Sequence, residues 1–144
     1  MNSSPMTDPG MVLDRLCKAT AAHDLEGVVG CFTPDYRNET PAHPERGFTG
    51  RDQVRTNWGR IFAMIPDITP EILRFVVDGD SVWSEWEHRG TRADGGRHLM
   101  RGVIIFGVDG DAISWARFYL EPVEDHGENA DASRERLIAA KDPT

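Results

Sequence analysis

The sequence predicts a single α+β domain in which helices come first and a mostly antiparallel sheet follows. Three observations predict this class. The chain has 144 residues, of which 39% are hydrophobic and 28% charged, as in one ordinary globular domain. Apolar residues recur at helical spacing as far as residue 65 and alternate with a period of two from residue 71. Asp- and Gly-rich turns at residues 78–80, 93–96 and 109–111 separate the strand-like segments.

Three helices are expected in the first half of the chain. One helical face is predicted by the spacing of Leu13, Leu16, Cys17 and Thr20. Asp24 is expected to cap a short second helix, whose apolar face extends to Phe32. Thr49 and Asp52 fit the capping box of a third helix, which ends before Pro66. Its predicted buried face consists of Val54, Trp58, Ile61, Phe62 and Ile65.

The extended segments come next. We expect a short strand at residues 36–40, a proline-rich loop at 41–47, and then four strands at residues 71–77, 81–92, 98–108 and 112–123. The last three are long for strands, which predicts a strongly curved sheet. Helices on one side of such a sheet leave a cone whose open mouth forms a small-molecule pocket.

The organisation and charge of the chain exclude several classes of protein. We expect a flexible N-terminus at residues 1–10, one domain at 11–123, and an acidic mobile tail at 124–144 with at most one helical turn. A net charge of −8 argues against a nucleic-acid-binding or membrane-surface protein. No signal peptide or membrane span is apparent, so a cytoplasmic location is predicted. Cys17 and Cys31 are expected to be buried thiols.

The order of these elements resembles the nuclear transport factor 2 (NTF2)-like superfamily, within it the SnoaL-like polyketide cyclase and ketosteroid isomerase-like group. The resemblance covers roughly residues 11–123. Its motifs are AHDLE at 22–26, FTPDY at 32–36, FTGRDQV at 48–54, EW at 85–86, GT at 90–91 and DGDAI at 109–113. The resemblance implies a cone-shaped fold of three N-terminal helices on an antiparallel or mixed sheet. It also implies a homodimer formed through the outer sheet face.

The catalytic residues of the similar enzymes are missing from this chain. Trp86 and His88 occupy the strand positions at which epoxide hydrolases of this fold carry arginine and aspartate. Phe118 occupies the position of a further aspartate that those hydrolases share with the SnoaL-type cyclases. The second aspartate of the ketosteroid isomerases corresponds to Ile104. Their base aspartate precedes a proline, a place that is held here by Thr40, with Glu39 one residue earlier.

Side-chain alternation and the resemblance together give the candidate site. We expect His88 and Glu39 to be the catalytic acid and base. The expected substrate-binding residues are Trp86, His43, Trp58, Met100, Ile104, Phe106 and Phe118. Structural alternatives remain open for the three polar residues. His88 would be a core histidine bonded to a carbonyl or carboxylate, and His43 a surface loop residue. Glu39 would be a solvated residue at a strand end or a partner of Arg37 or Arg46.

Other residue patterns predict no additional site. Glu85 and Glu87 alternate with a tryptophan, so both are expected on the outer face, where arginines pair with them. No metal-ligand spacing or phosphate loop occurs in the sequence, and no cofactor is predicted. Two functions follow. One is a cofactor-free isomerase, cyclase or epoxide hydrolase acting on a small apolar polyketide-like or terpenoid-like molecule. The other is a non-catalytic ligand-binding or dimeric accessory domain.

Overall fold

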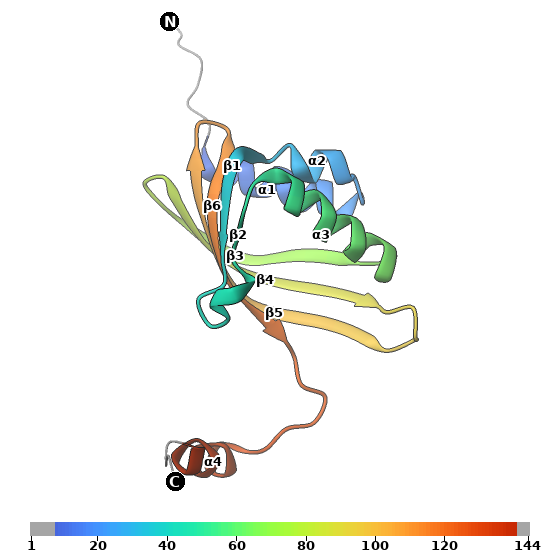
Figure 1. Cartoon of the computed structure of the whole chain (residues 1–144), viewed down its shortest axis with the longest axis vertical. Coiled ribbons are helices and arrows are strands. Elements are labelled where there is room, and N and C mark those ends of the chain that lie inside the picture. The colour runs from blue at the N-terminus through green and yellow to red at the C-terminus, as the bar shows by residue number, and fades with distance from the viewer. Residues whose placement is uncertain (1–7, 141–144) are drawn as a thin grey trace, which may run out of the picture.

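The computed structural model describes residues 8–140 as a layer of helices on one face of a six-stranded sheet (Figure 1). The helices-first order that the sequence predicts is confirmed. The helices are α1 (Pro9–Ala21), α2 (Leu25–Val29), the short 3-10 helix η1 (Pro44–Arg46), α3 (Arg51–Met64) and α4 (Ala130–Ala140). The strands are β1 (Phe32–Glu39), β2 (Phe48–Thr49), β3 (Thr69–Asp78), β4 (Ser81–Thr91), β5 (Arg97–Asp109) and β6 (Ala112–Pro122).

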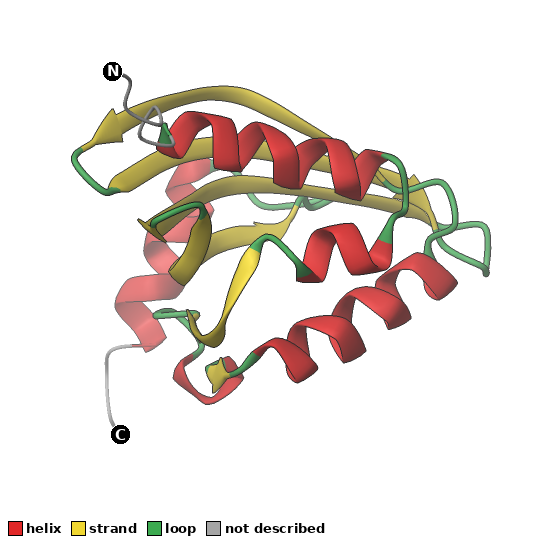
Figure 2. Cartoon of the chain, turned by 90° about the horizontal axis from the view of Figure 1, so that it is seen from above, coloured by secondary structure: helices red, strands yellow, loops and turns green. Residues whose placement is uncertain are grey.

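The sheet is mixed, with the strand order β2-β1-β6-β5-β4-β3. Strands β3 to β6 form the predicted antiparallel meander, and β1 joins it by pairing parallel to β6. Figure 2 shows α2 between α1 and α3, and contacts of α2 with both helices agree with this arrangement. The three helices cover one face, as the prediction required, and leave the other face of β3 to β6 open.

The first strand begins earlier than expected. Phe32, which the sequence analysis placed on the second helix, opens β1, because α2 already ends at Val29. The pairing with β6 shifts register between Phe32 and Arg37, so several residues of β1 have no ladder partner there. Pro34 lies in this irregular part, where its missing N–H removes no ladder hydrogen bond.

Side-chain caps set the start of the first two helices. Asp8 accepts a hydrogen bond from the Gly10 amide over 2.8 Å, so α1 begins at Pro9, inside the segment predicted to be flexible. The remainder of that segment, residues 1–7, lies outside the described residues. Asp24 caps α2 as predicted and accepts from the Gly27 amide over 3.0 Å.

The capping box predicted for the third helix is wrong. Thr49 belongs to β2, where it pairs with Arg37, and its side chain caps nothing. The N-cap of α3 is Gly50, with φ 102° and ψ 154°, and its amide donates to the Tyr36 carbonyl over 2.7 Å. The chain therefore turns from β2 into α3 through a backbone conformation that is open essentially to glycine alone.

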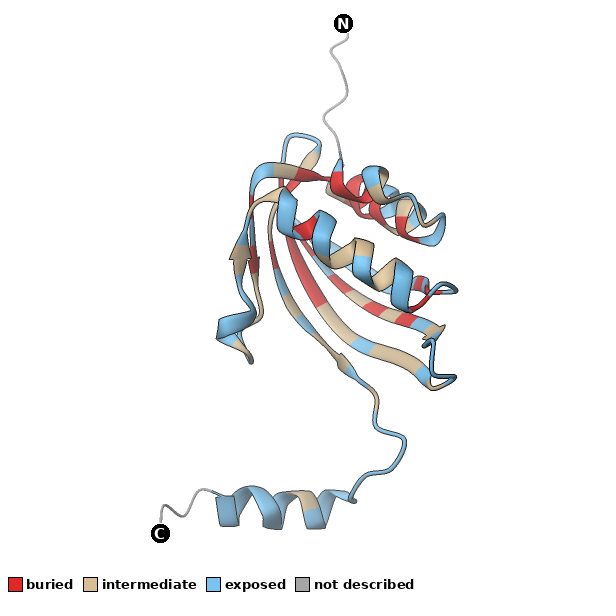
Figure 3. Cartoon of the chain, turned by 45° about the vertical axis from the view of Figure 1, so that its right-hand side comes forward, coloured by how far each residue is buried: buried red, intermediate tan, exposed pale blue. Residues whose placement is uncertain are grey.

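The core lies between the helices and the inner face of the sheet (Figure 3). Along β4 the buried residues alternate strictly with more exposed ones, and Val82, Ser84, Trp86 and His88 all face the helices. The facing residues Ile104, Phe106 and Ala116 of β5 and β6 are buried as well. The inward direction expected of the candidate-site residues Trp86, His88, Ile104 and Phe106 is therefore confirmed.

The tail contains more helix than predicted. Instead of one turn it forms α4, eleven residues long, which lies away from the sheet and buries none of its residues (Figures 1 and 3). Asn129 accepts a hydrogen bond from the Ala132 amide over 2.9 Å, and Arg134 pairs with Asp131 over 2.7 Å. These local bonds support the helix without a core contact. No helix within residues 8–140 is long and apolar enough to cross a membrane.

Candidate ligand-binding site

A cavity of about 300 Å³ opens between α3, the β1–β2 segment and the inner face of the sheet. Among its apolar lining residues are Phe32, Phe48, Trp58, Ile61, Met100, Phe118 and Leu120. Three of the predicted substrate-binding residues, Trp58, Met100 and Phe118, therefore line it. The size and the apolar lining suit a small molecule of about two fused rings.

The other predicted apolar residues lie deeper. Trp86, Ile104 and Phe106 surround a second chamber of only about 20 Å³. The rings of Trp58, His88 and Phe118 line both the cavity and this chamber, so they stand between the two. The deeper residues shape the floor of the site and do not border the main cavity.

His88 is a buried side chain on the wall of the cavity, with 7% of its surface exposed. Its ring makes edge contacts with Trp58 and Trp86, with centroid distances of 6.0 and 5.6 Å. Burial lowers the pKa of His88 to about 4, and the nearby His98 adds to this shift. The imidazole is therefore neutral at neutral pH.

No protein group supports that ring. Within residues 8–140 the His88 ring makes no hydrogen bond, which removes the alternative of a core histidine held by a carbonyl or carboxylate. Its nitrogens are not among the fully buried atoms that lack a partner, so they are accessible from the cavity. The polar groups next to it pair with one another instead. The Trp86 indole donates to the Ser84 hydroxyl over 2.8 Å, and Ser84 donates to the Ile104 carbonyl over 2.7 Å. The nitrogens of His88 are left to whatever occupies the cavity.

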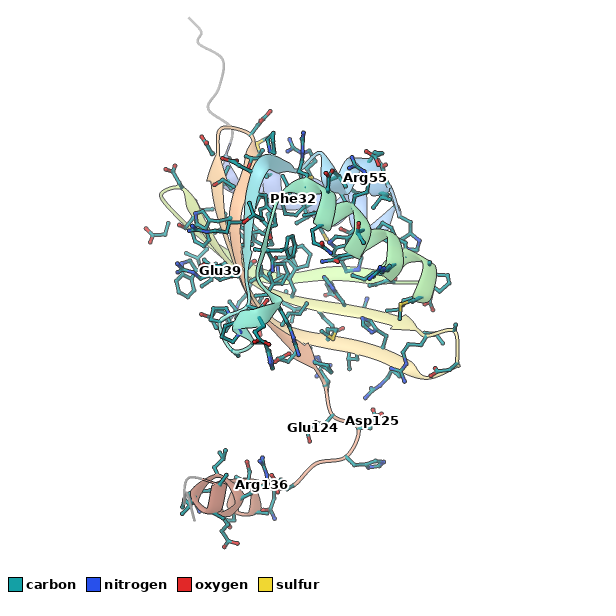
Figure 4. All side chains as sticks on the ribbon, viewed as in Figure 1. Phe32, Glu39, Arg55, Glu124, Asp125 and Arg136 are labelled. Atoms are coloured by element: carbon teal, nitrogen blue, oxygen red, sulfur yellow. The ribbon has the colours of Figure 1, made fainter. Side chains whose placement is uncertain are left out.

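Glu39 does not reach the cavity, which corrects its expected place at the mouth. The Arg117 side chain donates to its carboxylate over 2.8 Å, and this bond holds the pKa of Glu39 below its usual value. In the second half of β1 the buried side chains are Tyr36 and Asn38, so Arg37 and Glu39 point the other way. Figure 4 shows Glu39 on the side of β1 away from α3. The structural alternative of an arginine partner is correct, although the arginine is neither Arg37 nor Arg46.

His43 is also absent from the cavity lining. It precedes η1, and its Nε2 lies 2.6 Å from an oxygen of Glu121. This contact ties the proline-rich loop to β6. From the same loop Arg46 does line the cavity, with its guanidinium 4.0 Å from Glu121. The substrate-binding role expected of His43 therefore has no support, and the alternative of a loop residue outside the cavity agrees with this arrangement.

The sequence analysis missed the polar residues of β1 and α3. Tyr36 and Asn38 are buried and line the cavity, and the Tyr36 hydroxyl donates to Oδ1 of Asn38 over 2.8 Å. Asn57 lines the opposite side, next to Trp58 on α3. Side-chain alternation indicates that these two residues point the same way, because residues 36 and 38 share one face of a strand. The predicted strand at residues 36–40 contains both residues, but no site role is predicted for either of them.

The acidic pair of β4 is structural, as the sequence predicted. Glu87 accepts hydrogen bonds from Arg89 and Arg101, which lower the pKa of its carboxyl. Glu85 pairs with Arg74 over 3.2 Å on the same outer face. Among residues 8–140 no group of three or more His, Cys, Asp or Glu side chains could hold a metal ion.

Comparison with known proteins assigns the chain to a family. The sequence pattern of the SnoaL-like domain matches residues 13–116, which is most of the chain. The chain belongs to the SnoaL-like domain family. A comparison with curated protein sequences gives no match.

Solved structures similar to this SnoaL-like domain include both enzymes and proteins of unknown function. An epoxide hydrolase of M. tuberculosis, described as LEH-like, matches with a TM-score of 0.69 and 19% identity, over 81% of this chain and 84% of that one. The epoxide hydrolase/cyclase-like enzyme SalBIII, which has a role in pyran ring formation in the polyether salinomycin, matches with a TM-score of 0.68 and 17% identity, over 80% of this chain and 90% of that one. An NTF2-like protein of unknown function from Burkholderia pseudomallei matches with a TM-score of 0.66 and 18% identity, over 90% of this chain and 97% of that one. At these identities the similarity shows the NTF2-like fold alone.

Proposed function

We propose that this SnoaL-like domain binds a small, mostly apolar molecule and contacts one oxygen atom of that molecule through His88. The observation that carries the proposal is a buried imidazole on the cavity wall with no hydrogen-bond partner in residues 8–140. The ring nitrogens open into the cavity, so a hydrogen bond from the ring N–H to a ligand oxygen contributes about 0.5–1.5 kcal/mol. A hydrocarbon of the same shape lacks this contribution.

The rest of the cavity supports an apolar ligand of restricted size. Its volume of about 300 Å³ lies at the small end of the range for ligand pockets. Aromatic and aliphatic side chains, among them Trp58, Met100 and Leu120, form most of the walls. A bicyclic terpenoid-like or polyketide-like molecule matches these dimensions, and its polar atoms would meet a small number of fixed groups.

A cofactor-free isomerase, cyclase or epoxide hydrolase is the second candidate. The neutral state of His88 favours it, because a pKa of about 4 leaves the ring able to accept a proton at neutral pH. An aspartate of similar pKa, about 4.6, serves as the base in ketosteroid isomerase. Among the described residues that line the cavity, however, there is no carboxylate to complete an acid–base pair with His88. Binding is therefore the function that the geometry supports best.

The test compares two ligands that differ by one oxygen. Titration calorimetry would measure the affinity of 2-acetonaphthone and of 2-ethylnaphthalene for the wild type and for His88→Leu. We expect the wild type to prefer the ketone, and His88→Leu to lose about tenfold in affinity for the ketone alone, because one hydrogen bond disappears. The matched control is His126→Leu in the exposed segment before α4, which should change neither affinity.

The outcomes test the proposed binding function and distinguish a ligand-binding domain from an enzyme. Equal ketone affinity in the wild type and in His88→Leu contradicts the proposal. Catalysis is tested on the same complex by deuterium exchange of the ketone's methyl protons in D₂O. Exchange that is accelerated by the wild type and lost in His88→Leu identifies a proton-transfer enzyme. Tight binding without acceleration identifies a binding domain.

A further inference from the structure

Among the described residues that line the cavity, hydrogen-bond donors outnumber acceptors, although the chain as a whole is acidic. The acceptors are the Thr40 hydroxyl and the unprotonated nitrogen of each neutral imidazole. The sequence has 24 acidic and 16 basic residues. Among the described residues that line the cavity, however, there is no Asp or Glu, while Arg46 and the two histidines His88 and His98 are present. The nearest acidic side chains face away. Glu39 pairs with Arg117 on the outer face, and Glu121 contacts His43 beside the loop.

Asn38 presents a donor to the cavity because its oxygen is already engaged. Its Oδ1 accepts the Tyr36 hydroxyl hydrogen over 2.8 Å, and both side chains are buried. The amide hydrogens of Asn38 are then left for a ligand. If the amide were turned over, Asn38 would donate to Tyr36 and the phenolic hydrogen would be free instead. In either arrangement the pair offers the cavity a hydrogen and not a carboxylate.

The same pattern recurs on α3 and at the rim. Asn57 accepts from the Gln53 side chain over 2.8 Å, so its amide hydrogens remain available. Arg46 lies at the rim with its guanidinium 4.0 Å from Glu121, at the limit of an ion pair. That carboxylate is shared with His43, whose Nε2 lies 2.6 Å from its other oxygen. The positive charge of Arg46 is therefore only partly balanced, and its field extends into the mouth.

We infer that the cavity selects ligands whose polar end only accepts hydrogen bonds, a ketone or a carboxylate, and rejects those ending in an ammonium group. The inference rests on the proposed function and names its substrate class. A buried carboxylate or carbonyl oxygen finds donors from Asn38, Asn57 and His88. A buried ammonium finds no carboxylate, and a charge transferred from water without a partner is strongly disfavoured.

The test uses three probes of one shape at neutral pH. These are 2-acetonaphthone, 2-naphthoate and 2-(aminomethyl)naphthalene, the last of which is an ammonium ion under these conditions. We expect the ketone and the acid each to bind the wild type at least about tenfold more tightly than the amine, because only the amine brings a positive charge that no carboxylate of the cavity lining balances. Calorimetric affinities for each probe give the comparison directly.

A charge reversal at one atom sharpens the test. Asn38→Asp keeps the shape of the side chain and still accepts from Tyr36, but it places a carboxylate in the cavity. This variant should bind the acid more weakly and the amine more tightly than the wild type does. Asn57→Asp repeats the test on α3 in case the buried site does not tolerate the charge. The matched control is Asn129→Asp, whose side chain caps α4 away from the cavity and which should leave all three affinities unchanged.

The outcomes separate this inference from the proposal on which it rests. An amine that binds as tightly as the acid and the ketone overturns the donor-only selectivity and leaves the binding function standing. If none of the three probes binds, the proposed function itself fails. An acid that binds more tightly than the ketone, with the difference removed in Arg46→Gln, supports the inference and identifies anionic ligands. Equal affinities for the acid and the ketone support it and identify neutral carbonyl compounds.

Discussion

His88 combines two properties that a purely structural residue rarely has together. It is almost fully buried, and its ring contacts aromatic faces where a hydrogen-bonding group would normally be found. The neighbouring Trp86 is buried as well, but its indole N–H has a protein partner, because it donates to Ser84. Two polar side chains on one face of β4 therefore share an apolar environment, but only one of them is satisfied by the protein. The unsatisfied one lies on the cavity wall.

The lowered pKa of His88 predicts a specific loss of stability in mild acid. In the unfolded chain this histidine takes up a proton near its ordinary pKa of 6.5, whereas in the folded state it does so only near 4. Its contribution is fully present above pH 6.5 and is lost as the pH falls towards 4. Between about pH 7.5 and about pH 5 the wild type should lose roughly 2 kcal/mol more stability than His88→Leu.

Urea unfolding of both proteins across this pH range measures the difference. His88→Leu should also be at least as stable as the wild type at neutral pH, because leucine fills a similar volume without an unpaired polar group. Parallel pH profiles of the two proteins would show that His88 titrates normally, and its burial could not then be as described.

At the residue scale, His88 could be predicted from the sequence and Glu39 could not. The inward face of β4 follows from strict alternation over a long uninterrupted strand, so Ser84, Trp86 and His88 are placed correctly. The direction of Glu39 depends on the register shift in β1 between Phe32 and Arg37. It depends also on Arg117, which lies 78 residues further along the chain. Neither leaves a local signal.

The elements around the cavity depend on how the chain enters α3. Gly50 has φ 102° and ψ 154°, and a methyl group at this position would meet nothing within 4 Å. Gly59 lies inside α3 with ordinary helical geometry, and a methyl group there would contact Leu25 at 3.7 Å. A side chain at Gly50 would therefore be opposed by the backbone conformation alone, whereas at Gly59 neither the backbone nor the neighbouring side chain opposes it.

We therefore expect opposite effects from the same substitution. Gly50→Ala should destabilise the fold by about 1–3 kcal/mol, because alanine rarely adopts this backbone conformation. Gly59→Ala should stabilise it by about 0.5–1 kcal/mol through helix propensity and a smaller loss of backbone entropy on folding. Chemical denaturation at neutral pH measures both. A neutral Gly50→Ala would mean that α3 starts in another way, for instance through the capping box first predicted at Thr49.

Long helices and strands with a regular hydrophobic pattern could be predicted from the sequence, whereas the short connections between them could not. The change from helical spacing to alternation after Pro66 located α3 and the meander within a few residues. The parallel pairing of β1 with β6 joins segments that are far apart in the sequence, and nothing local to β1 indicates it. The cap of α3 likewise depends on a pairing with β1, because Thr49 in β2 pairs with Arg37 and the Gly50 amide donates to the Tyr36 carbonyl.

For the whole molecule, the sheet face opposite the helices remains to be assigned, and we propose that it forms a homodimer. Trp83 and Tyr119 are 52% and 44% exposed, and Val76 is paired with Trp83 across β3 and β4. Aromatic residues mixed with arginines are typical of interface cores. Light scattering should give twice the mass of one chain at a protein concentration of about 50 μM, at which an interface of standard size forms.

Trp83→Glu should shift this protein to the monomer, while Met64→Glu, an equally exposed substitution at the end of α3, should not. A wild type that stays monomeric at this concentration rules out the interface. Because the cavity opens on the other face of the sheet, loss of the dimer should leave ligand affinity unchanged.

His88 is neutral on the cavity wall and has no hydrogen-bond partner among residues 8–140, so its ring N–H is free for a ligand oxygen. Imidazole nitrogen NMR tests this most directly, with the His88 signals identified by their loss in His88→Leu. We expect a neutral ring that titrates near 4, with an N–H resonance that shifts when 2-acetonaphthone is added. A ring that titrates near 6.5 and does not respond to the bound ketone would contradict it.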